Sequence, residues 1–272
     1  MPQGPRVISV TSGKGGVGKT NIVANLAVSM AKQGKKVLIF DADLGLANID
    51  IIFNMHPRFN IGHVIRGEKN LNEVIVHTSH GIGIVPAGSG FVNLTQLENS
   101  EKLHLLSEFD SLDQEIDVML IDTGAGISNN VIYFNLAADE CIVVATFEPT
   151  SITDAYAMIK VMSTEHNTKY FKLLVNMVSQ PEEAKSVYGS ISRAVDRFLN
   201  NVILEYVGFI PIDTMLPTSV IRRKPVVELF PNAVSSKTFM QLSASLLASP
   251  RRFESNGNIK FFLKKMMNFT KN

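Results

Sequence analysis

Short runs of apolar residues recur along the chain, and stretches with apolar residues at helical spacing separate most of them. Continuous apolar runs of this length are typical of strands buried on both faces. They predict strands at residues 7–11, 36–41, 81–87, 117–122, 141–146, 171–178 and 202–211. Helical periodicity predicts helices at 21–33, 95–110, 128–137, 151–165, 182–200 and 233–247. This alternation favours an α/β fold with a mostly parallel central sheet and helices on both faces.

Composition narrows the class of protein. A chain of 272 residues with 45% hydrophobic content suits one large α/β domain. The single cysteine, Cys141, sits in an apolar run, and one cysteine forms neither an intrachain disulfide nor a CxxC metal motif. The sequence has no run of 18 apolar residues, and its start does not resemble a signal peptide. We therefore expect a cytoplasmic protein.

The first candidate site is a glycine-rich loop between the strand at 6–11 and the helix at 21–34. Its residues fit the phosphate-binding pattern G-x-x-x-x-G-K-[ST]. In that context backbone N–H groups point at phosphates, Lys19 reaches the β- and γ-phosphates, and the Thr20 hydroxyl binds Mg²⁺. The expected nucleotide-binding residues of the loop are Gly13, Lys14, Gly15, Gly16, Val17, Gly18, Lys19, Thr20 and Asn21.

Polar residues follow several other predicted strands. Asp41 and Asp43 end the second strand, and Asp122 ends the fourth. Carboxylates at strand ends beside a P-loop suit Mg²⁺ coordination and the orientation of an attacking water, although a single such Asp is as often a loop or helix cap.

The sequence signal for an adenine-binding region is weaker than the signal for the phosphate-binding loop. Asn176 ends the sixth strand, and a proline-containing loop ends the seventh. A carboxamide can read a base edge, and such a loop offers backbone groups, but an isolated Asn is more often a turn residue. The candidate residues of this loop are Pro211, Ile212 and Asp213.

Lys14 is a second lysine in the loop, where an ordinary P-loop accepts almost any residue. At the mouth of the site it can cross a dimer interface and meet the phosphates of a partner's ATP, in the manner of an arginine finger. The alternative is a solvated surface lysine.

The segment "KGGVGKT" resembles the deviant Walker A motif of the MinD/ParA group of ATPases. "DADLGLANIDIIF" (41–53) resembles the switch I of that group, "LIDTGAGIS" (120–128) its switch II, and "EPTSITDAYAMIKVM" (148–162) one of its helices. The resemblance covers roughly residues 5–248. It implies a P-loop NTPase fold of the MinD-like (SIMIBI) type and an Mg²⁺-dependent ATPase that dimerises face to face around two ATP molecules.

The resemblance also implies roles for single residues. Lys14, Lys19 and Asp43 form the catalytic set: Lys14 acts in trans, and Asp43 positions the attacking water. Asp41 and Asp122 support the Mg²⁺ shell, while Asn176 and the loop 211–213 bracket adenine. Without ATP the protein is a monomer in which Asp154 pairs with Lys14. The remaining dimer and switch positions are Gly124 and Gly126.

Within the group, the motifs "GKTN", "VPAGSG" (85–90), "DTGAGIS" and "EPTSITDAYA" resemble the flagellar-number regulators of the FlhG type. Division-site MinD proteins typically have Pro at the position of Gly124 and Arg at that of Ala47. The implied partners are the flagellar GTPase FlhF, switch-complex proteins and a flagellar transcription activator. Many FlhG proteins stimulate FlhF through an N-terminal extension. Here the first strand opens at Arg6, so we expect either that this route is absent or that the sequence is a truncated or differently annotated start.

The end of the chain has its own pattern. Residues 251–272 carry six basic side chains and one acidic one, a net +5, which leaves −4 on the rest. We expect an ATPase domain at 1–248, a linker at 249–258 and an amphipathic helix at 259–270 that binds an anionic membrane surface on its cytoplasmic side in the ATP state. A last helix packed on the core is the plainer alternative. The membrane residues are Ile259, Phe262, Leu263, Met266, Met267 and Phe269, with Lys260, Lys264 and Lys265 opposite them.

Three other functions stay open. A MinD-type division-site ATPase shares the fold, the ATP dimer and the tail. A ParA-type DNA-partition ATPase needs a basic surface on the folded body, where the net charge is −4; we expect no specific nucleic-acid partner. A metabolic P-loop kinase leaves both Lys14 and the tail unexplained.

Overall fold

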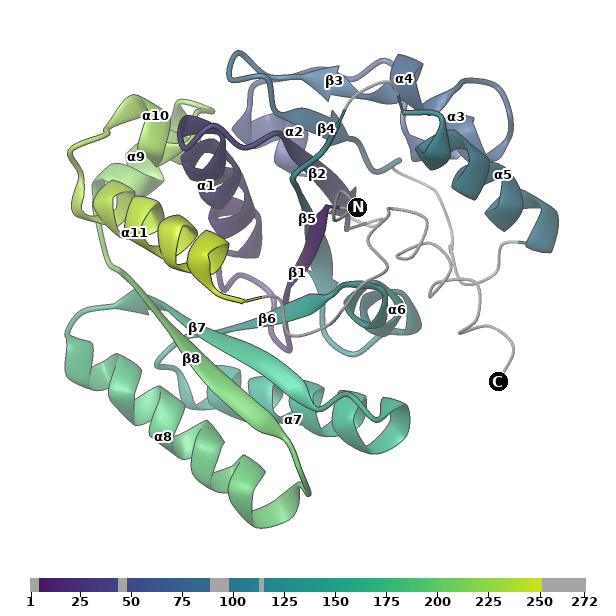
Figure 1. Ribbon diagram of the computed structural model, residues 1–272. Coiled ribbons are helices and arrows are strands. Elements are labelled where there is room, and N and C mark those ends of the chain that lie inside the picture. Colours follow the sequence, from purple (N-terminus) through teal and green to yellow (C-terminus); the bar gives the residue numbers. More distant parts are fainter. Residues whose placement is uncertain (1–4, 44–47, 89–97, 113–114, 251–272) are drawn as a thin grey trace.

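The computed structural model describes residues 5–43, 48–88, 98–112 and 115–250. Its centre is an eight-stranded sheet in the order β3-β4-β2-β5-β1-β6-β7-β8, parallel except for the antiparallel pair β3–β4 (Figure 1). All seven predicted strands are present, and β3, with two residues, is too short to leave a periodic signal. The strands are β1 (Arg6–Ser12), β2 (Val37–Ala42), β3 (Val76–His77), β4 (Gly83–Val85), β5 (Val118–Ala125), β6 (Glu140–Ala145), β7 (Tyr170–Val178) and β8 (Ile203–Pro211).

Six helices correspond to the predicted ones, and five short helices lie outside the predicted helical ranges. The six are α1 (Lys19–Lys32), α5 (Asn99–Asp110), α6 (Asn129–Ala137), α7 (Pro149–His166), α8 (Pro181–Phe198) and α11 (Val234–Ala248). The short ones are α2 (Ile49–Ile52), α3 (Ile61–Ile65), α4 (Leu71–Val74), α9 (Met215–Ile221) and α10 (Val226–Leu229). No helix in the described part of the chain is long and apolar enough to cross a membrane.

The strands are apolar on both faces because both faces are covered. In β2, Leu38 and Phe40 pack into one cluster, whereas Val37 and Ile39 pack into the opposite one. The second cluster lies under α1 and α11, and the first lies under α3, α5 and α6. A third cluster joins α7 and α8 to β6 and β7, and Figure 1 shows these helices on the far side of the sheet from α1 and α11. Cys141 is buried in this third cluster, as expected.

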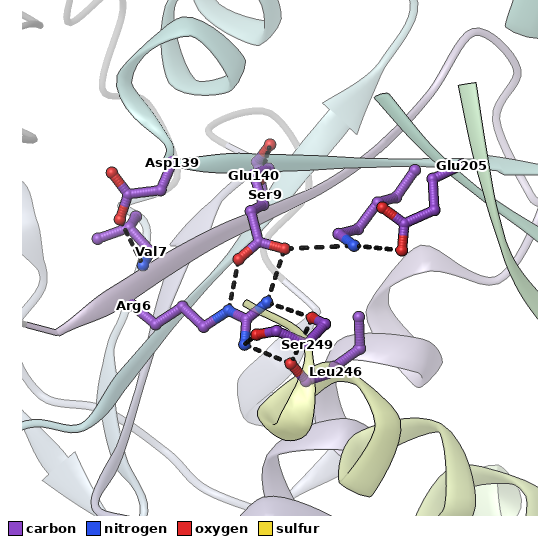
Figure 2. A network of polar contacts seen from close by, with 9 residues as sticks. Arg6, Val7, Ser9, Asp139, Glu140, Glu205, Leu246 and Ser249 are labelled. Atoms are coloured by element: carbon purple, nitrogen blue, oxygen red, sulfur yellow. Dashed lines mark hydrogen bonds and ion pairs between the residues drawn. The ribbon is translucent and has the colours of Figure 1, made fainter. Parts of the chain in front are cut away.

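A buried ionic network closes the amino end of the sheet, opposite the phosphate-binding loop (Figure 2). Arg6, which is 3% exposed, forms an ion pair with Glu140 on β6 and donates to the carbonyls of Leu246 and Ser249. Lys172 bridges Glu140 and Glu205 at 3.6 and 2.9 Å. The guanidinium therefore satisfies carbonyl groups that the last turn of α11 leaves without helical partners. The predicted linker beyond residue 250 and the predicted helix at 259–270 lie outside the described residues.

Candidate nucleotide-binding site

A cleft of about 580 Å³ opens at the carboxyl ends of the central strands, where ligands bind in sheets of this kind. The loop that joins β1 to α1 forms its floor, and its walls come from the segment after β2, the ends of β5 and β7, and α9. Among the predicted residues that line it are Gly15, Gly16, Gly18, Lys19, Thr20, Asn21 and Asp43. Four apolar lining residues were not predicted as site residues: Ile51, Ile52, Met177 and Val220. Ile51 and Ile52 lie on α2 within the predicted switch I segment, whereas Met177 on β7 and Val220 on α9 belong to no predicted motif.

Close packing explains several glycines of the loop. Gly18 has φ +93, a left-handed conformation that favours glycine, and a Cβ there would lie 2.5 Å from the Asn176 amide nitrogen. A Cβ on Gly13 would lie 2.7 Å from the Cβ of Asp154, and closer still to its carbonyl group. The loop is thus packed tightly between β7 and α7.

Lys19 is nearly buried, with 8% of its surface exposed, and its ammonium donates to the Ser12 hydroxyl at 2.9 Å. Burial lowers the pKa of Lys19, and the carboxylates of Asp122 and Asp43 oppose this effect. Ser12 was not predicted as part of the site, because it precedes the motif and ends a strand.

Asp41 and Asp122 face each other as register partners on β2 and β5, and each is 1% exposed. Burial raises the pKa of Asp122 to about 7, although hydrogen bonding to Thr20 and the charge of Lys19 pull it down. The pKa of Asp41 is raised well above its usual range by burial and then by the charge of Asp122. The Asp43 N–H donates to Asp41 at 3.2 Å. This cluster of acids therefore favours a cation in its midst.

Thr20 and the acids at the ends of β2 and β5 suit the binding of Mg²⁺. The Asp122 Oδ1 atom is buried and has no hydrogen-bond partner within the described residues, while the Thr20 side chain bonds the same carboxylate. In the same part of the chain, His, Cys, Asp and Glu side chains form no group of three that could hold a metal by themselves. A magnesium ion here would take the Thr20 hydroxyl and phosphate oxygens as ligands, with the acids behind it.

The residues expected at adenine have structural partners. Asn176, 6% exposed, donates its amide to the Val17 carbonyl at 2.8 Å and so ties β7 to the loop. Asp213 accepts from the Ser235 N–H and hydroxyl at 2.9 and 2.8 Å, which joins the end of β8 to α11. Burial would raise the pKa of Asp213, but these hydrogen bonds, together with those from the Met215 and Val234 N–H groups, outweigh it, and the pKa is lowered. Pro211 ends β8, and Ile212 is 61% exposed.

Lys14 has an intramolecular partner, and it is not the expected one. Its ammonium forms an ion pair with Glu148, the N-cap residue of α7, and donates to the Thr150 hydroxyl at 3.0 Å. In this structure Lys14 pairs with Glu148, not with the Asp154 that the resemblance implied. Asp154 lies six residues further along, and its backbone packs directly against Gly13. The Lys14 side chain is 36% exposed, and Lys14 does not line the cleft.

The end of β5 and the residue that follows it contact both Asp43 and the end of β1. The Gly126 N–H donates to the Ser12 carbonyl at 2.9 Å, and Gly126 has φ +86. A Cβ on Gly124 would lie 3.5 Å from the Asp43 carboxylate. The two predicted switch glycines therefore lie next to the P-loop and the second acid. Of the predicted switch I segment, residues 44–47 lie outside the described residues, as do 89–90 of "VPAGSG".

A phosphate-binding loop with a second lysine, in a parallel sheet with acids at the ends of β2 and β5, defines the deviant Walker A ATPases of the MinD/ParA type. Residues 5–174 match the family described as an AAA domain. The chain belongs to this family of P-loop ATP-binding proteins, and both the expected fold and the expected group are confirmed.

Within the group, two relatives are similar over most of their length. The antiactivator FleN of Pseudomonas aeruginosa is 38% identical over 262 residues, which cover 96% of this chain and 93% of FleN. The flagellum site-determining protein YlxH of Helicobacter pylori is 37% identical, over 89% of this chain and 82% of YlxH. The chain is therefore FlhG-like.

Solved structures agree on the fold. The Aquifex aeolicus MinD in a MinC:MinD complex is 26% identical, with a TM-score of 0.70 over 93% of this chain and all of that one. MinD of Pyrococcus horikoshii, solved with Mg-ADP, has a TM-score of 0.71 at 23% identity, over 89% and 96% of the two chains.

Proposed function

We propose that this chain is an ATP-driven switch that regulates the number and placement of flagella. The observation that carries the proposal is a complete P-loop with a second lysine, Lys14, in a chain 38% identical to the antiactivator FleN and 37% identical to the flagellar protein YlxH. The switch alternates between an ATP-bound dimer and a monomer.

The chemistry proposed for the cleft is ATP hydrolysis. The loop backbone binds the phosphates, and Lys19 directs its remaining N–H groups toward the β- and γ-oxygens. Asp43, at the end of β2, orients the attacking water and accepts its proton. Mg²⁺ bound at Thr20, with Asp41 and Asp122 behind it, would neutralise the charge of the β- and γ-phosphates.

The proposed switch uses Lys14 in trans. In the monomer this side chain is held by Glu148 and Thr150. An exposed ion pair of this kind contributes only about 0–1 kcal/mol, so the phosphates of a partner's ATP can replace it. Hydrolysis removes the γ-phosphate and returns Lys14 to Glu148.

The proposed output of the switch is binding to the cell membrane. We propose that residues 259–270 form an amphipathic helix that binds anionic lipid weakly as one copy and strongly as two, because the second copy binds within the same assembly. The protein is then cytoplasmic as a monomer and peripheral on the inner face of the membrane as a dimer. The proposed partners are FlhF, flagellar switch-complex proteins and a flagellar transcription activator.

A division-site role is the second candidate, because MinD proteins are also similar: that of Helicobacter pylori is 26% identical over 89% of this chain. Deleting the gene in its host and counting flagella and minicells by electron microscopy separates the two. We expect an altered number of flagella and normal division. Minicells in cells with normal flagella would refute the flagellar proposal and favour the MinD-type role.

A further inference from the structure

Ser12 is a fully buried polar residue for which the ATP chemistry has no assigned role. It is the last residue of β1, is 0% exposed and does not line the cleft. Its hydroxyl nevertheless makes two short hydrogen bonds, accepting from the Lys19 ammonium at 2.9 Å and donating to the Lys14 carbonyl at 2.6 Å. One hydroxyl thus connects the two lysines of the loop.

We infer that Ser12 is a positioning residue, which aims the Lys19 ammonium at the nucleotide phosphates and fixes the loop backbone at Lys14. The inference rests on the proposed ATP site and adds a residue to its machinery that never touches the nucleotide.

The direction of the two bonds explains why the geometry is fixed. A hydroxyl has one proton, and here it is directed to the Lys14 carbonyl, so its lone pairs face Lys19. The ammonium has three N–H groups; one is directed to Ser12, and two stay available for phosphate oxygens. The Ser12 carbonyl also accepts from the Gly126 N–H at 2.9 Å, which holds the residue itself in place.

The chain offers a matched control. Ser9 lies on the same strand and is also 0% exposed, but its hydroxyl bonds the Glu140 carbonyl at 3.5 Å, away from both lysines. Figure 2 shows Ser9 with the network at the other end of β1. Ser9→Ala therefore measures the effect of removing a buried hydroxyl from β1 without touching the site.

The experiment compares full-length wild type, Ser12→Ala, Ser12→Thr and Ser9→Ala. ATP affinity is measured by calorimetry with MgCl₂, and the thermal midpoint is recorded with and without ATP. A hydrogen bond to a charged group corresponds to roughly a 10- to 100-fold change in an equilibrium constant. We expect Ser12→Ala to lose at least that lower factor in affinity and most of the ATP-induced rise in midpoint. Ser12→Thr, which keeps the hydroxyl, and Ser9→Ala should resemble wild type.

The outcomes are distinct. Equal ATP affinity in Ser12→Ala and wild type would overturn the inference and leave the proposed function intact. An equal loss in Ser9→Ala would also overturn it, because the effect would then belong to the strand. A wild-type protein that binds no ATP would instead refute the proposed function. If Ser12→Ala does not fold, Ser12→Cys, a weak hydrogen-bonding group of similar size, takes its place with the same expected loss.

Discussion

Replacement of Gly13 by Ala should separate the P-loop from α7. The added Cβ would lie 2.7 Å from the Asp154 Cβ and closer still to the backbone carbonyl of the same residue. Carbon atoms pack at about 3.5–4.0 Å, so the loop and the helix must move apart by about 1 Å. Neither side yields easily, because the loop follows a central strand and Asp154 lies in the second turn of an 18-residue helix. Overpacking of this kind costs about 1–3 kcal/mol of stability.

The functional effect of Gly13→Ala should exceed the effect on folding. A displacement of about 1 Å in groups that position a substrate can lower a rate by about 100-fold, so we expect a loss of that order in ATP turnover, measured by phosphate release. Gly189→Ala is the control, because it lies on α8, outside the cleft, and its Cβ would meet only the flexible Arg193 guanidinium at 3.2 Å. We expect this variant to hydrolyse ATP within about threefold of the wild-type rate. Normal turnover in Gly13→Ala, or an equal loss of turnover in Gly189→Ala, would refute the packing argument.

Three further predictions concern other parts of the molecule. Arg6→Met should lower the free energy of unfolding in urea by about 3–5 kcal/mol, because it leaves buried Glu140 without its main partner. The control Lys36→Ala breaks an exposed ion pair, and its free energy of unfolding should stay within about 0.5 kcal/mol of wild type. Asn176→Ala should weaken ATP binding about tenfold through loss of the bond to the Val17 carbonyl, and Asn176→Asp should not restore it, because a carboxylate offers no donor; tight binding by either variant would argue against this. The pKa of Asp122 is about 7 in the nucleotide-free folded state, against an ordinary value of 3.8. The folded state therefore holds a proton that the unfolded chain releases, and the free energy of unfolding falls as pH rises between these two values. Asp122→Asn should flatten this pH dependence when urea unfolding is compared at pH 5 and pH 8; an unchanged pH dependence would assign it to another group.

Most of the sheet and the outline of the site could be predicted because they follow local patterns. The strands are continuous apolar runs, since both faces are covered, and the P-loop has a fixed spacing of glycines between a strand and a helix. Asp41 and Asp122 could be placed together because parallel strands end at the same edge of a sheet.

The parts that were missed depend on contacts between residues far apart in the sequence. The pairing of Lys14 with Glu148 instead of Asp154 follows from how closely α7 packs on Gly13, a distance that no sequence pattern specifies. Ser12 was missed because a serine at the end of a strand is common, and only its two bonds give it a role. Short helices such as α2 and α10 have too few residues to show a period.

The central claim is that ATP drives dimerisation and hydrolysis reverses it. The most direct measurement is analytical ultracentrifugation of full-length Asp43→Ala with ADP and with ATP, each with Mg²⁺. If Asp43 positions the attacking water as proposed, this variant should bind ATP and release no phosphate. It should sediment at twice the 29.9 kDa chain mass with ATP, but at the chain mass with ADP. A variant that binds ATP and still sediments as a monomer, or one that hydrolyses ATP at the wild-type rate, would contradict the account.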